Sequence, residues 1–118
     1  MAAGGWLNVA TPLASAEIFS PTPATWAATG SLGTAREFHS ATLLGNGNLL
    51  VTGGQLVAGN GTSLIGTTEV FNWASQTWAY SGALNDARVL HSATLLGDGS
   101  VLAAFGLDAD VVSEIYVP

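Results

Sequence analysis

Most of the side chains that could take part in chemistry occur at repeating positions in the sequence. They are Arg36 and Arg88, His39 and His91, and Glu17, Glu69 and Glu114. A group that serves one unique substrate does not need to recur in this way. Because arginine and carboxylate groups form strong charge-assisted hydrogen bonds, the pattern predicts a structural Arg–Glu pair between strands, repeated along the chain. The alternative is a ring of arginines that lines an anion-binding channel.

The remaining residues offer little support for enzymatic chemistry. The chain has no cysteine, which excludes disulfides, a thiolate nucleophile and a thiolate metal site. His39 and His91 lack carboxylates at a recognisable metal-binding spacing, so we interpret both as structural residues. Hydrolysis by paired acids needs two carboxylates in different environments, and Glu37 and Asp86 do not occupy equivalent repeat positions. We therefore predict no catalytic residue, no metal and no cofactor.

Composition excludes two classes of partner. Hydrophobic residues make up 48% of the chain and charged residues only 8%, which indicates a folded protein. The formal net charge is −6, with no lysine and only two arginines, so binding to nucleic acid or to an anionic membrane surface is not expected. No apolar run is long enough to span a bilayer, and no secretory signal is visible at the start of the chain.

The elements that must position these residues are encoded in an internal repeat. The segment from Glu17 to Gly54 aligns without gaps with Glu69 to Gly106 at an offset of 52, and about half of the positions are identical. A third, incomplete copy begins at Ser113, and Gly4-Gly5 stands before Glu17 much as Gly53-Gly54 stands before Glu69. The shared residues include Trp26 and Trp78, Ala35-Arg36 and Ala87-Arg88, and the heptapeptide His-Ser-Ala-Thr-Leu-Leu-Gly that begins at His39 and His91.

Each repeat is expected to contain four short strands and no helix. Runs of β-branched and aromatic residues predict strands at 69–72, 76–80, 91–96 and 100–105. The turn between the last two, Gly97-Asp98-Gly99, and its counterpart Gly45-Asn46-Gly47 are typical of tight hairpins, in which both central residues have positive φ. Four strands in a repeat of about 50 residues are typical of one blade of a β-propeller.

At the level of motifs, the chain resembles bacterial kelch-repeat β-propellers. The resemblance rests on Glu-Ile-Phe and Glu-Val-Phe, on the two Thr-Trp pairs, on Arg with His three residues later, and on the paired glycines. It implies an all-β fold of four-stranded antiparallel blades, about two per chain: a partial blade at 1–30, a full blade at about 35–80 and a partial blade at about 87–118. Two departures are Phe105, which replaces the first of the paired glycines, and Trp73, which replaces Pro21.

The blade count leads to an expectation about assembly. Propellers close with about 4 to 8 blades, so two blades do not close alone. Either copies of the chain form a ring or the chain belongs to a longer propeller. Because six or seven blades are usual in the family that it resembles, we expect a homo-oligomer, with three copies supplying six blades. The third strand at 113–118 would then duplicate the one at 16–20 of a neighbour.

A ligand surface is expected where the sequence departs from its own repeat. Trp26 and Trp78 recur and are therefore interpreted as packing residues. The unmatched aromatics Trp6, Phe38, Trp73 and Tyr80 are candidates for a ligand site or an interface, as is Asn60 in the long insertion 55–67.

These observations favour a non-catalytic module for recognition of a protein or ligand and for assembly. The alternative is a carbohydrate-binding propeller or a fragment of a carbohydrate-active enzyme. Galactose oxidase, a copper enzyme, carries a kelch propeller, but its cofactor joins a cysteine to a tyrosine and this chain has no cysteine. A third possibility is a purely structural building block.

Overall fold

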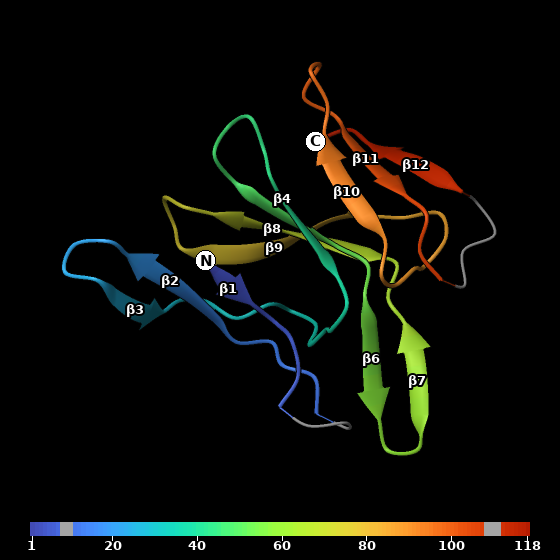
Figure 1. Cartoon of the computed structure of the whole chain (residues 1–118), viewed down its shortest axis with the longest axis horizontal. Helices are drawn as coiled ribbons and strands as arrows, with labels where there is room; N and C mark the ends of the chain where they lie inside the picture. The colour runs from blue at the N-terminus through green and yellow to red at the C-terminus, as the bar shows by residue number, and fades with distance from the viewer. Residues whose placement is uncertain (8–10, 108–111) are drawn as a thin grey trace.

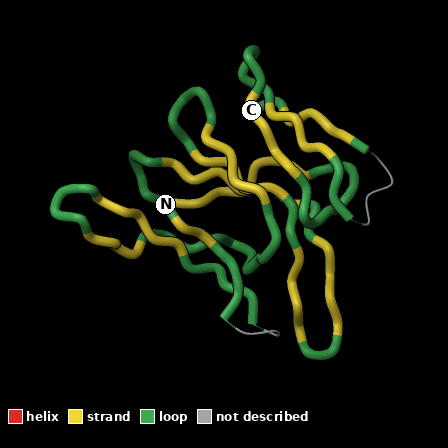
Figure 2. The backbone as a smooth tube through the Cα atoms, viewed as in Figure 1, coloured by secondary structure: helices red, strands yellow, loops and turns green. Residues whose placement is uncertain are grey.

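The computed structural model describes residues 1–7, 11–107 and 112–118, and within them it contains only strands and loops (Figures 1 and 2). No helix that could cross a membrane is found in this part of the chain. The all-β prediction is therefore confirmed at the level of several small antiparallel sheets.

Three sheets follow one another along the chain, and a separate hairpin projects from the middle one (Figure 1). The N-terminal sheet contains β1 (Ala2–Ala3), β2 (Ala16–Ser20) and β3 (Thr25–Ala28). The central sheet has the order β4-β5-β8-β9 and consists of β4 (Ser40–Leu43), β5 (Leu49–Thr52), β8 (Thr67–Asn72) and β9 (Thr77–Ala83). The C-terminal sheet contains β10 (Ser92–Leu95), β11 (Val101–Ala104) and β12 (Ser113–Tyr116). The insertion forms the projecting hairpin of β6 (Gln55–Ala58) and β7 (Gly61–Leu64).

The predicted strands are present, with small differences in their ends. The central sheet has the four strands that one repeat predicts, and β9 continues to Ala83, beyond the predicted end at Tyr80. Within this sheet Val51 of β5 lies opposite Ala41 of β4 and opposite Glu69 of β8. That register places the repeated glutamate in the middle of the sheet.

The two predicted glycine-containing hairpins are present, but the predicted turn type, with positive φ at both central residues, was wrong. Only the second glycine of each has positive φ, with values of 86° at Gly47 and 90° at Gly99. The N–H of Gly47 donates to the carbonyl of Leu44, and the N–H of Leu44 donates to the carbonyl of Asn48. The loop therefore has three residues, in which a turn is followed by one left-handed glycine, and this arrangement needs only that one positive φ.

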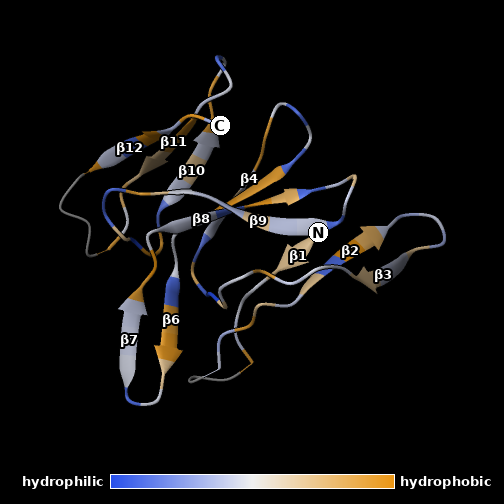
Figure 3. Cartoon of the chain, turned by 180° about the vertical axis from the view of Figure 1, so that it is seen from behind, coloured by the Kyte–Doolittle hydropathy of each residue, from blue (hydrophilic) through white to orange (hydrophobic). Residues whose placement is uncertain are grey.

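Neighbouring sheets pack through a small apolar core and through backbone contacts. Leu44, just after β4, and Leu50 of β5 pack with Val101 of the C-terminal sheet, and Val70 and Tyr116 lie against this cluster. This apolar cluster therefore joins the central and C-terminal sheets. In Figure 3 hydrophobic residues colour parts of β2 and β6, while the loop between β4 and β5 is hydrophilic at its tip.

The paired glycines permit the closest approach between the sheets. Gly53 has a φ of 62°, and a Cβ there would lie 2.7 Å from the carbonyl oxygen of Arg88 and 2.7 Å from Cε1 of His91. Gly4 stands in the same relation to the next unit, because its Cβ would lie 2.8 Å from the carbonyl oxygen of Arg36. Phe105, at the position that corresponds to Gly53, keeps the same backbone with a φ of 60° and is exposed.

Candidate ligand-binding site

The repeated arginines form the predicted pairs with glutamates of their own sheets. Arg36 is fully buried, and its Nη2 donates to Glu69 Oε1 at 2.7 Å. Its Nη1 donates to the carbonyl oxygens of Gly53 at 2.8 Å and Thr67 at 2.9 Å. The carboxylate of Glu69 also accepts the backbone N–H groups of Gly33 and Thr34. The pair therefore connects the segment before β4 to β5 and β8.

The second pair repeats this arrangement. Arg88 Nη2 donates to Glu114 Oε1 at 2.6 Å, and the backbone N–H groups of Asn85 and Asp86 donate to the same carboxylate. Burial of Glu114 raises its pKa, but the hydrogen bonds from Asn85, Asp86 and Arg88 together outweigh this and hold the pKa below its ordinary value.

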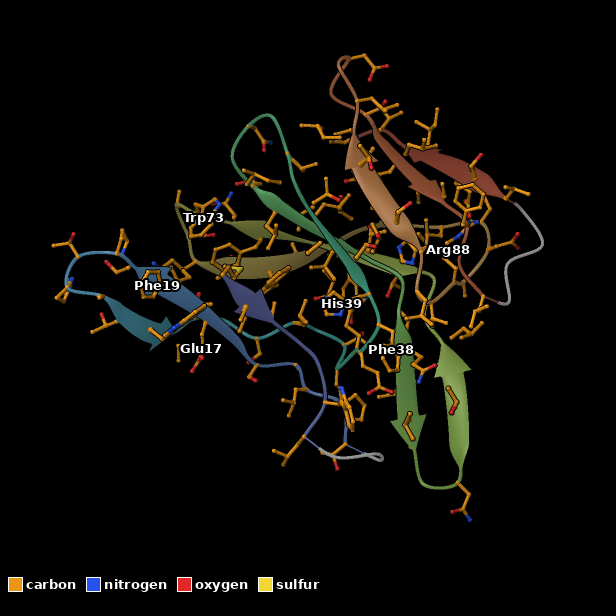
Figure 4. All side chains as sticks on the ribbon, viewed as in Figure 1. Glu17, Phe19, Phe38, His39, Trp73 and Arg88 are labelled. Carbon is orange, nitrogen blue, oxygen red and sulfur yellow. The ribbon has the colours of Figure 1, made fainter. Side chains whose placement is uncertain are left out.

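Glu17 occupies the same repeat position and differs from the other two glutamates. Its side chain is exposed on the N-terminal sheet, at the edge of the molecule in Figure 4, together with Phe19. Phe71, at the position equivalent to Phe19, is completely buried. The same motif is therefore buried in the central sheet and open to solvent in the N-terminal sheet.

The two histidines lie between consecutive sheets, next to the paired glycines. His91 Nε2 is 2.9 Å from Thr52 Oγ1, whereas Nδ1 of both histidines is buried without a hydrogen-bond partner. Burial, the positive charge of Arg88 and the proximity of His39 lower the pKa of His91 to about 4. Burial and Arg36 likewise lower the pKa of His39. Among the residues in 1–7, 11–107 and 112–118, no group of three potential metal ligands is formed.

Two of the unmatched aromatic residues come together with the insertion. A cavity of about 300 Å³ is lined by Trp6, Phe38 and Glu37 and by three residues of the β6–β7 hairpin, namely Gln55, Val57 and Thr62. Figure 4 shows Phe38 beside the base of β6. Trp6 and Phe38 are 53% and 43% exposed, so both present apolar surface at this cavity. We call this cavity the Trp6–Phe38 pocket.

A polar pair forms part of the wall of this pocket. The backbones of Glu37 and Gln55 bridge each other through two hydrogen bonds of 2.9 and 3.0 Å. The Gln55 side-chain amide donates to Glu37 Oε1 at 2.8 Å. In the other repeat the same backbone bridge joins Val89 to Leu107. The backbone bridge therefore also forms with two apolar residues, so the fold does not require the polar Glu37–Gln55 pair.

The other predicted ligand or interface residues lie elsewhere. Trp73 packs edge-on against Phe71, with ring centroids 5.1 Å apart. Tyr80 is exposed, and its hydroxyl lies 2.7 Å from Thr34 Oγ1. Asn60 is exposed at the tip of the β6–β7 hairpin and does not line the pocket.

The repeated tryptophans each pack against the phenylalanine of the adjacent strand. Trp26 lies 5.4 Å from Phe19 and Trp78 lies 5.2 Å from Phe71, measured between ring centroids. Both contacts agree with a packing role, although Trp26 is exposed on its outer side.

Sequence reasoning missed the contribution of Glu37 and Gln55 to the Trp6–Phe38 pocket. Glu37 was considered only as a possible catalytic acid, and Asp86, the other such acid, lies beside Glu114 in a different unit. The signal that could have identified the pair is their departure from Val89 and Leu107 at equivalent repeat positions.

Comparison with known proteins identifies no family for this chain. No protein-family model matches the chain, and no curated protein matches it in sequence.

Proposed function

We propose that the chain is a non-catalytic recognition and assembly module built from kelch-type propeller blades, which binds its ligand in the Trp6–Phe38 pocket. The observation that carries this proposal is the meeting of Trp6, Phe38 and the β6–β7 hairpin around one cavity. All three features depart from the repeat, so the scaffold does not require them. Exposed aromatic walls with a few polar groups are typical of ligand sites.

The blade assignment draws support from the sheet order and from the Arg–Glu pairs. The central sheet has four antiparallel strands in which β5 and β8 are neighbours, and the insertion β6–β7 lies outside the sheet. The same backbone contacts recur at both junctions, since the N–H of Gly5 donates to Arg36 O and the N–H of Gly54 donates to Arg88 O, each at 2.9 Å. The blades of a propeller are arranged radially, which requires the same contacts between each sheet and the next.

A binding role is favoured over catalysis by the charges around the pocket. Glu37 is the one carboxylate among its described lining residues, whereas hydrolysis by paired acids needs two. Asp86 is engaged at the pair of Arg88 and Glu114, in another unit. The pocket is thus suited to holding a ligand.

Binding is tested on a peptide and glycan array with three variants. Trp6→Ala and Phe38→Leu are expected to lose the signal of the wild-type chain while keeping its thermal stability. Trp73→Ala serves as the matched control, because Trp73 packs on Phe71 outside the pocket. Selective binding that survives both pocket variants would contradict the proposal.

Carbohydrate is the second candidate ligand. Aromatic rings cover the apolar faces of sugars, and the Glu37–Gln55 pair could bind hydroxyl groups. Binding to glycans alone on the array, dependent on Phe38, would favour this candidate over a protein ligand.

Assembly uses the two outer sheets of the chain. Phe19 and Trp26 are exposed on the N-terminal sheet, and Ile115 and Val117 are exposed on or next to the C-terminal sheet. Covering these apolar side chains by other copies stabilises a ring, and three copies supply six blades. Both arginines are engaged within their own units, so we expect Glu17 to remain in contact with water in such a ring.

The assembly state is measured by light scattering at micromolar concentration. A discrete trimer is expected. A stable, folded monomer of 11.9 kDa would contradict the assembly and leave the binding proposal untouched.

A further inference from the structure

The charge of Glu37 is not balanced by a cation of the described chain. Glu37 is only 6% exposed, and its side chain accepts a hydrogen bond from Gln55, a neutral group. The chain contains only two arginines and no lysine, and both arginines bind other glutamates. A carboxylate removed from water without a cationic partner is unfavourable, so a bound cation would stabilise this site.

The aromatic walls of the pocket also attract cations. The faces of tryptophan and phenylalanine rings carry partial negative charge and attract cations within about 6 Å of the ring centroid. Trp6 and Phe38 line the same cavity as Glu37 and expose 53% and 43% of their surface. The net charge of −6 also raises the local concentration of small cations around the protein.

Hydrogen bonding discriminates between kinds of cation. A guanidinium group binds a carboxylate best when both oxygens are available to its planar fork. One oxygen of Glu37 already accepts the amide of Gln55. A primary ammonium has three N–H donors to satisfy, whereas a quaternary ammonium has none and is readily accommodated by aromatic rings.

The size of the cavity also suits a compact group. Its volume of about 300 Å³ lies at the lower end of the usual range for ligand sites.

We infer that the Trp6–Phe38 pocket binds a quaternary ammonium group, held by the two aromatic rings and by the carboxylate of Glu37. This inference rests on the proposed recognition function and specifies the chemistry of its ligand. The group is shared by trimethylated lysine in a partner protein and by choline in a lipid headgroup.

The test compares choline with 3,3-dimethylbutan-1-ol, which has the same shape and no charge. Binding to the full chain is followed by NMR shifts of the tryptophan indole N–H groups, with Trp6→Phe to assign the signal of Trp6. We expect choline to bind at least about tenfold more tightly than the alcohol. Equal affinity of the two compounds would overturn the inference.

Variants test whether the preference for choline over the alcohol depends on Glu37. Glu37→Gln is expected to weaken choline binding at least about tenfold and to leave the alcohol unaffected. The double variant Glu37→Val with Gln55→Leu should also weaken choline binding. It should still fold, because Val89 and Leu107 form the equivalent backbone bridge in the other repeat. Leu90→Ala, at the position equivalent to Phe38 and outside the pocket, is the matched control. Unchanged choline binding in the folded double variant would refute the role of Glu37.

The source of the group is distinguished with two further probes. Tighter binding of an acetylated trimethyl-lysine amide than of phosphocholine identifies a protein side chain, and the reverse order identifies a lipid headgroup. Either order supports the inference. If none of the cations binds while the array still gives a Phe38-dependent signal, the inference fails and the proposed function stands.

Discussion

Replacing Glu69 with glutamine should strongly destabilise the fold, whereas the same change at Glu17 should have almost no effect. The two glutamates occupy equivalent positions of the repeat, 52 residues apart. Glu69 is buried and accepts hydrogen bonds from Arg36, Gly33 and Thr34. Glu17 is exposed.

The magnitude follows from what Glu69→Gln leaves behind. The guanidinium of Arg36 stays fully buried but loses its counter-charge. In addition, the amide NH₂ of the new glutamine would face groups that are themselves donors, because all three partners of Glu69 donate to it. Breaking a buried ion pair in this way costs about 3–5 kcal/mol. For a domain of this size the melting temperature should fall by roughly 10–20 °C.

The assay is urea unfolding monitored by tryptophan fluorescence, together with a thermal melt, on wild type, Glu69→Gln and Glu17→Gln. We expect Glu17→Gln to stay within about 0.5 kcal/mol of wild type. Equal stabilities of the two variants would refute the reasoning, since they would show that burial of this pair does not contribute to the fold.

The other predictions concern the second ion pair, pH and the paired glycines. Arg88→Ala should destabilise by a few kcal/mol in the same assay because it leaves the carboxylate of Glu114 without its cation, and an unchanged melting temperature would contradict this. His91 is neutral in the fold with a pKa of about 4, against about 6.5 when unfolded, so the unfolded chain binds more protons between these values. Stability should therefore fall as the pH drops from about 6.5 toward 4, and His91→Gln should reduce this fall in urea titrations at a series of pH values. Gly53→Ala should destabilise more than Gly47→Ala, because both have positive φ but only the Cβ at Gly53 would lie 2.7 Å from a backbone oxygen; equal melting temperatures would argue against the close approach of the sheets.

Much of the local structure could be predicted from the sequence because the chain repeats itself. A residue that recurs at a constant spacing serves the scaffold, and this reasoning identified the strands and both Arg–Glu pairs before their geometry was known. The pairing itself was predictable because an arginine buried within an apolar repeat needs a carboxylate partner. The turns at Gly47 and Gly99 were assigned wrongly because Asn-Gly and Asp-Gly also fit a three-residue loop, and hydrogen bonding decides between the two.

The sequence by itself determined the all-β character, the repeat and the Arg–Glu pairs of the central and C-terminal sheets. The tertiary structure alone decided which copies of a motif are buried and which unmatched residues meet. Glu17 and Glu69 occupy equivalent positions of the repeat, yet only Glu69 is buried, because burial depends on what packs against the sheet. Likewise Trp6 and Phe38 are distant in sequence and form one pocket only because the junction of two units brings their loops to the base of the β6–β7 hairpin. Periodicity encodes local strand structure, whereas a binding site is a long-range arrangement that no short segment specifies.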